Sequence, residues 1–219
     1  DEPDRYTLVF NGEIYNYIEL REQLIAEFGA EFATEGDGEP IVVGYHHWGS
    51  NVVEHLRGMF GIVIWDTKTK TMFATRDQFG IKPLYYATTD AGTVFASEMK
   101  CILDMAEDIG LELNLDRRAI EHYVDLQYVP EPETLHEEIR RVESGCTVTL
   151  TYQGDGTASE PAARHTRAQR PGRARRCDGH VQFGTAHLVV VAQAGVRGVH
   201  QLPEPRRIRL QCGEHPRVL

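Results

Sequence analysis

The stretch that decides the fold is Val9-Phe10-Asn11-Gly12-Glu13-Ile14-Tyr15-Asn16-Tyr17. Residues 6–10, which lead into it, are mostly β-branched, aromatic or aliphatic, and such a run predicts a strand. Apolar residues then recur at steps of three and four, which predicts an amphipathic helix. These residues are Ile14, Tyr17, Ile18, Leu20, Leu24, Ile25 and Phe28. We therefore expect Asn11 and Gly12 to lie where a strand passes into a helix.

Such a joint can bind an anion. The first N–H groups of a helix have no partner within the helix and carry the positive end of its dipole. Gly12 has no side chain to keep a ligand from the backbone, and the Asn11 amide can donate a hydrogen bond beside it. The pair is a candidate oxyanion hole for an acyl-transfer intermediate. The alternative is a plain turn, because Asn-Gly is a common turn dipeptide.

The composition indicates a globular domain followed by a segment of another kind. The chain has 219 residues, is 41% hydrophobic and 9% aromatic, and carries a net charge of −10, which argues against a nucleic-acid-binding surface. Residues 1–152 hold 12 Lys+Arg and 28 Asp+Glu, whereas residues 153–219 hold 11 Arg and 5 Asp+Glu. We expect one domain over residues 1–152 and an unrelated, basic, disordered tail over residues 153–219.

Hydrophobic periodicity predicts an α+β domain. A helix is expected to start at Pro40 and run to Trp48, since proline suits the first turn of a helix. Short β-prone runs separated by turns predict successive antiparallel strands, and helices precede and follow them. The strands are expected at residues 60–66, 71–75, 82–87, 93–97 and, as the last one, 146–152, with further helices at 98–105 and 114–124.

Two acidic residues have both a structural and a functional interpretation. Asp37 precedes the helix expected at Pro40, so it suits an N-cap. Glu13 suits the first turn of the preceding helix, where the dipole favours an acid. Either carboxylate can instead bind a ligand cation.

The remaining candidates favour structural roles. His46 and His47 are adjacent, so they point to different faces of a helix, and no acid stands at ligand spacing; no metal site is predicted. Cys101 lies in an apolar helix and suits the core. Arg76 and Asp77 together suit an ion-pair element that organises loops at a strand end, rather than a catalytic pair.

The sequence shows no signal peptide and no apolar run near the ~20 residues that a membrane span needs. The four cysteines form no CxxC pair. We expect a cytoplasmic protein without membrane or nucleic-acid partners.

Several segments, in order, resemble the glutamine-dependent asparagine synthetases, which belong to the class II glutamine amidotransferases. The resemblance covers about residues 5–150. It is carried by Asn-Gly-Glu-Ile-Tyr-Asn at 11–16, Asp-Gly-Glu at 37–39, Leu-Arg-Gly-Met-Phe at 56–60, Arg-Asp at 76–77, Phe-Gly-Ile-Lys-Pro-Leu-Tyr-Tyr at 79–86, Ala-Ser-Glu-Met-Lys at 96–100 and Tyr-Val-Pro-Glu-Pro at 128–132.

The resemblance implies the αββα four-layer sandwich of the N-terminal-nucleophile hydrolases. It implies that Glu13 and Asp37 hold the α-ammonium of L-glutamine, and that Asn11 and Gly12 stabilise the oxyanion formed when an N-terminal cysteine attacks the side-chain amide. The ammonia would then pass to an aspartyl adenylate made with ATP and Mg²⁺ in a second domain of a homodimeric enzyme. No cofactor is expected within this chain.

Both ends of the chain depart from the family pattern. The chain begins with Asp1 rather than Met, so a fragment without the nucleophilic cysteine is expected. Beyond Gly154 the resemblance stops and no Ser-Gly-Gly loop for pyrophosphate follows. The tail is rich in residues with GC-rich codons and lacks Lys, which favours out-of-frame translation; a basic tail that binds an acidic partner, with its best patch at 164–176, is the alternative.

From these departures we expect the chain alone not to make asparagine and to hydrolyse glutamine negligibly. Three other assignments stay open at this point. They are a non-catalytic glutamine-binding or regulatory module, a β-lactam-synthetase-like relative, and another class II amidotransferase such as a glucosamine-phosphate or phosphoribosylamine synthase.

Overall fold

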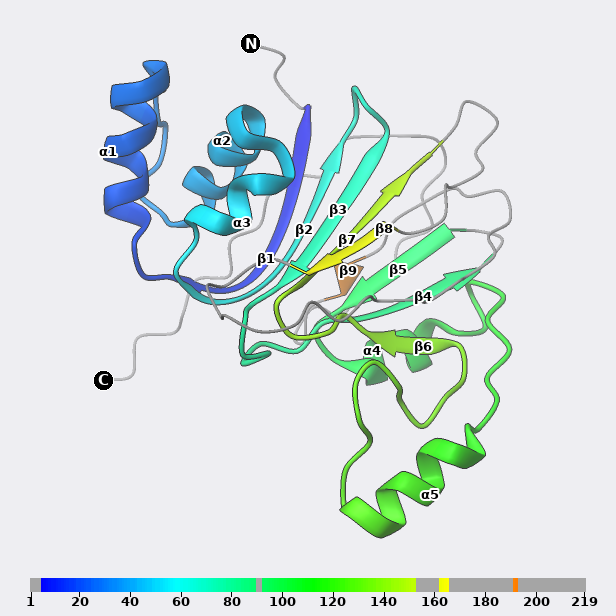
Figure 1. Cartoon of the computed structure of the whole chain (residues 1–219). Helices are drawn as coiled ribbons and strands as arrows, with labels where there is room; N and C mark the ends of the chain where they lie inside the picture. The colour runs from blue at the N-terminus through cyan, green and yellow to red at the C-terminus, as the bar shows by residue number, and fades with distance from the viewer. Residues whose placement is uncertain (1–4, 90–91, 153–161, 166–190, 193–219) are drawn as a thin grey trace, which may run out of the picture.

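Two stacked β-sheets with helices on both outer sides make up the structure (Figure 1). The computed structural model describes residues 5–89, 92–152, 162–165 and 191–192. In chain order the elements are β1 (Tyr6–Ile14), α1 (Tyr17–Phe28), α2 (Gly38–Trp48), the 3-10 turn η1 (Gly49–Asn51), α3 (Val52–His55), β2 (Gly58–Asp66), β3 (Thr71–Arg76), β4 (Tyr85–Thr89), β5 (Gly92–Ala96), α4 (Met99–Met105), α5 (Arg117–Leu126), β6 (Ile139–Arg141), β7 (Cys146–Thr151), β8 (Ala162–His165) and β9 (Val191–Ala192).

The strands are divided between two sheets. The first has the order β1-β2-β3-β7-β8 and the second the order β6-β4-β5-β9. The expected hairpins, β2–β3 and β4–β5, are both antiparallel, and among the strands that the structure describes only the short β5–β9 pairing is parallel. The two hairpins lie in different sheets, which the succession of turns in the sequence did not reveal.

Three layers of apolar side chains lie between the four layers of helices and sheets and hold them together. The first lies between α1–α3 and the first sheet, where Ile14, Ile41 and Ile62 are fully buried. The second joins the two sheets through residues such as Val63 and Phe95, and the third packs α4 against the second sheet. Successive residues of a strand face opposite sides, so Ile62 and Val63 serve different layers. The expected αββα architecture is confirmed.

Two helices begin later than the sequence predicted. Helix α1 starts at Tyr17, because Ile14 still belongs to β1 and pairs with Gly58. Helix α5 starts at Arg117, where the Asp116 side chain caps it by accepting hydrogen bonds from two backbone N–H groups. In both places an apolar residue before the helix extended the apparent helical period.

The prediction that residues 146–152 form the last strand was wrong. Strand β8 pairs antiparallel with β7, and β9 pairs with β5. The other residues of the expected disordered tail lie outside the described part of the chain. No alternation of apolar and polar residues marks these two short strands, so pattern alone could not find them.

Arg76 and Asp77 organise the connection between the two sheets, as expected of a structural pair. The buried Arg76 guanidinium donates to the carbonyl oxygens of Gly80, Lys82 and Val142 and to the Glu131 carboxylate at 2.6 Å. The Asp77 carboxylate accepts from the N–H groups of Phe60, Phe79, Ile81 and Lys82. The ion-pair partner of Arg76 is therefore Glu131, not its neighbour.

Glu131 is charged in this environment. Burial by itself would raise the pKa of its carboxyl group, but the Arg76 guanidinium and the N–H and hydroxyl of Ser144 lower the pKa below its ordinary value. The pair joins the end of β3 to the loop that precedes β6, so it couples the first sheet to the second.

A second, partly buried ion pair closes the start of β1. Arg5 donates through Nε and Nη2 to the two carboxylate oxygens of Asp66, at 3.0 and 2.9 Å. The N–H groups of Lys68 and Thr69 also donate to Asp66. Burial raises the pKa of Asp66, but these hydrogen bonds outweigh it and lower the pKa to about 2.

The substitution Asp66→Asn is expected to lower the free energy of unfolding by about 1.5–3 kcal/mol at neutral pH, because hydrogen bonds to a charged group are lost. The folded state holds this carboxylate deprotonated below the ordinary pKa of 3.8. The stabilisation is therefore fully present above about pH 4 and is lost as pH falls toward about 2. Urea unfolding followed by tryptophan fluorescence measures it, with Asp104→Asn on the exposed side of α4 as control. If the free energies of unfolding of wild type and Asp66→Asn differed by the same amount at pH 7 and pH 2.5, the stabilising role of the charged Asp66 would be contradicted.

Candidate functional site

The structure corrects the predicted setting of Asn11 and Gly12. Both lie inside β1, opposite Gly61 and Phe60 of β2, and helix α1 begins only at Tyr17. The candidate anion site therefore lies on a strand and not in the first turn of the helix. Glu13 is likewise a strand residue with an exposed side chain, so the interpretation as a first-turn helical acid is wrong.

Gly12 is required by a close approach of two backbones. Its φ is +155°, and a Cβ built at this position would lie 2.0 Å from the carbonyl oxygen of Met59. A Cβ at Gly58, on the opposing strand, would lie 2.1 Å from the carbonyl oxygen of Glu13. Strands β1 and β2 thus approach at a pair of glycines where no side chain fits.

The Gly12 N–H is directed away from the sheet. Strand β1 is an edge strand, so the peptide groups of alternate residues face outward. Phe60, the register partner of Gly12, exchanges hydrogen bonds with Asp77 through its own N–H and carbonyl. Two residues on, the N–H of Ile14 also points off the edge, toward Asp37. An N–H that points off a strand edge can donate a hydrogen bond to an oxyanion.

The Asn11 side chain lies between the two sheets. Its Nδ2 donates to the hydroxyl oxygen of Ser97 at 3.1 Å, and Ser97 follows the end of β5. Asn11 is half-buried and Ser97 is buried. An amide has two N–H donors. Ser97 therefore fixes the carboxamide through one N–H and leaves the other for a ligand.

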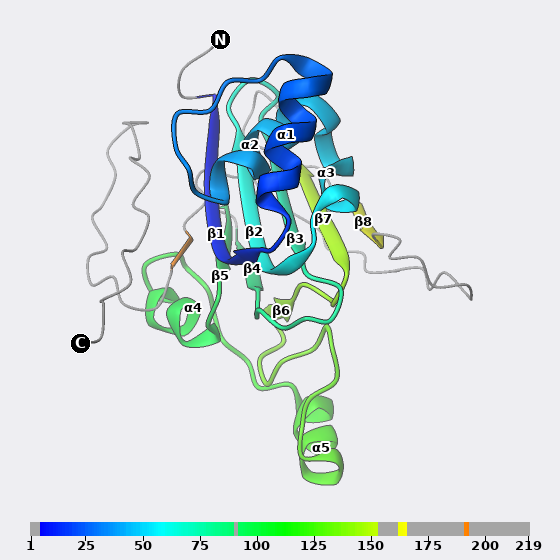
Figure 2. The ribbon, with the colours of Figure 1, turned by 90° about the vertical axis from the view of Figure 1, so that its left-hand side faces the viewer.

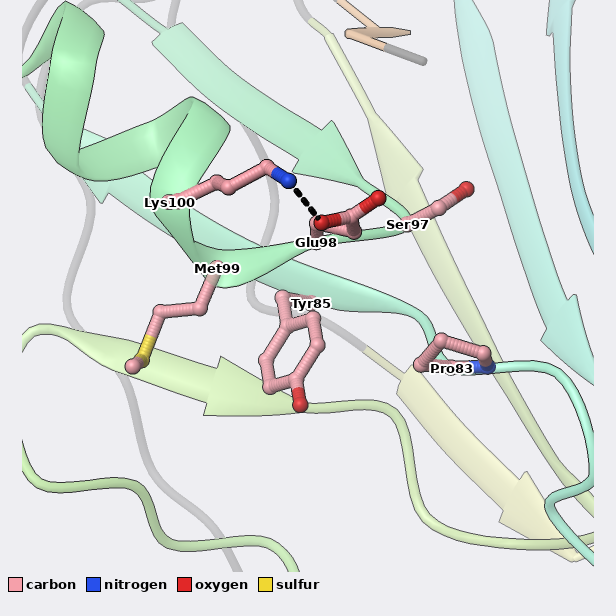
Figure 3. Close-up of a pocket in the computed structure, with 6 residues that line it drawn as sticks. All are labelled: Pro83, Tyr85, Ser97, Glu98, Met99 and Lys100. Carbon is pink, nitrogen blue, oxygen red and sulfur yellow. Dashed lines mark ion pairs between the residues drawn. The ribbon is translucent and has the colours of Figure 1, made fainter. Parts of the chain in front are cut away.

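Ser97 also lines a small pocket of about 250 Å³ (Figure 3). The other lining residues are Pro83, Tyr85, Glu98, Met99 and Lys100. Lys100 forms an ion pair with Glu98, and this partner raises the pKa of the exposed Lys100 ammonium. The pocket thus has a polar wall and lies beside the residue that orients Asn11.

Asp37 joins the site through the backbone of β1. It occupies the N-cap position of α2, but its side chain makes no capping hydrogen bond. Its Oδ2 instead accepts from the N–H of Ile14 at 3.0 Å, next to Glu13. The N-cap prediction for Asp37 is therefore right about its position and wrong about its hydrogen-bond partner. Glu13 and Asp37, which come from two separate segments, lie at the same end of β1.

Two residues of this region were missed as site elements. Ser97 was noted only as part of a matching segment, and no local pattern shows that it reaches across to Asn11. Asn16 is buried and holds the segment after β1 to the connection between α3 and β2, with Nδ2 donating to the His55 carbonyl and Oδ1 accepting from the Arg57 N–H. The sequence feature that could have pointed to Asn16 is a polar asparagine among apolar residues at the expected start of the helix.

The other candidates have structural surroundings. His46 shares a hydrogen bond with the Tyr6 hydroxyl at 3.1 Å, and His47 stacks on Phe28. Cys101, within α4, packs against the core between this helix and the second sheet, and Cys146 is buried. Among the described residues no group of three or more His, Cys, Asp or Glu is placed to hold a metal ion. None of the helices in that part of the chain is long and apolar enough to cross a membrane.

Comparison with known protein families shows to which family the chain belongs. Residues 1–160 match the sequence profile of the glutamine amidotransferase domain. The chain belongs to this family. The profile ends eight residues beyond Tyr152, the domain boundary expected from the sequence.

Full-length relatives are much longer than this amidotransferase-domain chain. It is 60% identical over 146 residues to a Mycobacterium bovis protein that carries a provisional name of glutamine-hydrolysing asparagine synthetase, covering 67% of the chain and 22% of that protein. It is 42% identical over 156 residues to glutamine-hydrolysing asparagine synthetase 1 of Bacillus subtilis, covering 71% and 24%. The chain therefore spans less than a quarter of these relatives.

The fold is shared with a solved amidotransferase. Glutamine phosphoribosylpyrophosphate amidotransferase from B. subtilis aligns with a TM-score of 0.50 and 16% identity, over 77% of this chain and 31% of the other. At this identity the likeness concerns the fold alone. It agrees with the four-layer arrangement of helices and sheets.

The substitution Gly12→Ala is expected to destabilise the protein by about 1–3 kcal/mol from backbone strain alone, with the clash against Met59 adding to it. Gly36→Ala serves as control, because a Cβ at Gly36 meets nothing within 4 Å. Chemical denaturation of both variants measures the difference. Equal midpoints for the two would contradict the close approach of β1 and β2.

Removing the Ser97 hydroxyl is expected to release the Asn11 carboxamide. In Ser97→Ala, the side-chain amide resonances of Asn11 in a ¹⁵N-¹H correlation spectrum should move toward those of a solvated amide. Ser144→Ala, which removes a hydroxyl bonded to Glu131, should leave them in place. Unchanged Asn11 resonances in Ser97→Ala would show that this hydrogen bond does not form.

Proposed function

We propose that this chain forms the glutamine-binding part of an asparagine synthetase, the half that releases ammonia from L-glutamine. The observation that carries the proposal is the hydrogen bond from the Ile14 N–H to Asp37. It brings a carboxylate from the start of α2 to the edge strand that carries Asn11, Gly12 and Glu13. Two acids and two oxyanion donors then surround one end of β1.

The residues would divide the ligand between them. Glu13 and Asp37 provide negative charge for the α-ammonium group, since charge-assisted hydrogen bonds are the strong ones. The outward N–H of Gly12 and the second N–H of the Asn11 amide suit the oxygen of the side-chain carboxamide. As a nucleophile adds to that carbon, the oxygen gains charge, and these donors stabilise it without reorganising.

The complete reaction extends beyond these residues. A thiolate adds to the glutamine amide, ammonia leaves, and water releases glutamate from the thioester. In the proposed whole enzyme, a ligase that is cytoplasmic and homodimeric, ATP and Mg²⁺ act in a separate domain on aspartate. The residues described here bind and orient glutamine and stabilise the oxyanion. We further propose that this unit ends near residue 152 and that β8 and β9, which pair with β7 and β5, belong to the segment that follows it.

The substitution Asp37→Asn tests the ammonium site. Asparagine keeps an oxygen that accepts from the Ile14 N–H, so the fold is retained while the charge is lost. We expect glutamine to bind roughly ten- to hundredfold more weakly, matching about 1.5–3 kcal/mol for a charged hydrogen bond. Isothermal titration of the 219-residue chain with L-glutamine measures the change.

Matched variants separate charge from general effects. Glu13→Gln is expected to weaken binding in the same way, whereas Glu22→Gln, an exposed acid on α1, should not. Glutaric acid monoamide, which has the carboxamide without the α-ammonium, should bind Asp37→Asn and wild type equally. Equal affinity of wild type and Asp37→Asn for L-glutamine would refute the proposed role of Asp37.

A further inference from the structure

Helix α5 presents an apolar face that the described residues do not cover. Ile120, Tyr123 and Val124 are 37%, 51% and 67% exposed, and Ala119 is the buried residue of this helix. The spacing of these three side chains is that of one helix face. In both views α5 stands apart from the two sheets (Figures 1 and 2). Leu126, the last residue of the helix, and Tyr128, just beyond it, are also exposed.

The contacts that hold α5 fix its base and not this face. The Asp116 N–H donates to the Leu135 carbonyl, and Leu115 pairs with His136 in an isolated bridge. His122 approaches Glu133 on the side turned toward the following loop. A helix of about ten residues is marginal in water unless its apolar face packs against another surface. The exposed face therefore fits a helix that completes its packing on a partner.

The polar side of α5 indicates the kind of partner. It carries two arginines and two acids, Arg117, Arg118, Glu121 and Asp125, so its charges balance. A helix that lies on an anionic membrane needs a predominantly basic polar side. Anchors at positions i, i+3 and i+4 with mixed charge around them are instead typical of a helix seated in a protein groove.

We infer that this face of α5 docks into an apolar groove on the part of the longer asparagine synthetase relatives that lies outside the region matched here. This inference rests on the proposed function. The matched 146 residues are 22% of the M. bovis relative, so more than three quarters of that protein remains to cover the face. A covalently joined partner also has a high effective concentration, which lets one small face suffice.

Hydrogen exchange tests the inference in a full-length protein. The M. bovis relative would be prepared with its matched 146 residues replaced by the corresponding residues of this chain. Amides of residues 117–126 are expected to exchange at least tenfold more slowly there than in the 219-residue chain. Val124→Glu should restore fast exchange, because it places a charge in the groove. A smaller graft of residues 117–128 alone serves where the larger exchange does not fold.

The control is Ile18→Glu on α1, a side chain with a similar exposure of 56% on another helix, which should leave α5 protected. Equal exchange in the chimera and the 219-residue chain overturns the inference. Protection of α5 in the 219-residue chain that rises with concentration would instead indicate a second copy, and protection independent of concentration would indicate cover by the chain's own tail. Either result overturns it. Glutamine affinity, which does not involve α5, reports separately on the proposed function.

Discussion

The approach of β1 to β2 at Gly12 and Gly58 is the constraint on which the rest of the site depends. Neither strand admits a Cβ at these positions, because each would meet a carbonyl oxygen of the other within about 2.1 Å. The pairing keeps β1 extended as far as Ile14 and turns alternate N–H groups off the sheet edge. The same register delivers the Ile14 N–H to Asp37 and leaves the Gly12 N–H directed outward.

The apolar layers then bring the other groups to this edge. Asp37 precedes α2, and α2 is held against the first sheet by Ile41, which is fully buried. Ser97 follows β5 in the second sheet, which the middle layer packs against the first. The candidate site is therefore assembled from three layers of the sandwich, and its geometry depends on packing between sheets as well as on β1 itself.

Much of the fold could be predicted, because periodicity is a local property. The continuous apolar run before Asp66 and the turn after it define β2 and β3 without further information. The extension of β1 through Asn11 could not be predicted in this way. Ile14 fits the end of a strand and the start of the following helical period equally well, and only pairing with Gly58 decides between them.

The candidate site, like the fold, could be predicted only where local sequence patterns carry the information. Local pattern singled out Asn11 and Gly12 as possible oxyanion donors and Glu13 and Asp37 as acids near helix starts, and a resemblance carried by several short segments added their roles toward glutamine. Asp37 and Asn11 do lie close to the same strand edge. Ser97 lies 86 residues from Asn11 in sequence, and no spacing rule connects them. The partner of Arg76 was missed for the same reason, since Glu131 follows 55 residues later.

The hydrogen bonds of Arg76 and Asp77 have a consequence for how this family can vary. One guanidinium and one carboxylate together satisfy backbone groups at Phe79, Gly80, Ile81 and Lys82. Adding or removing a single residue in this connection between β3 and β4 would leave several of these groups without partners inside the protein. Homologous chains should therefore keep this connection at constant length.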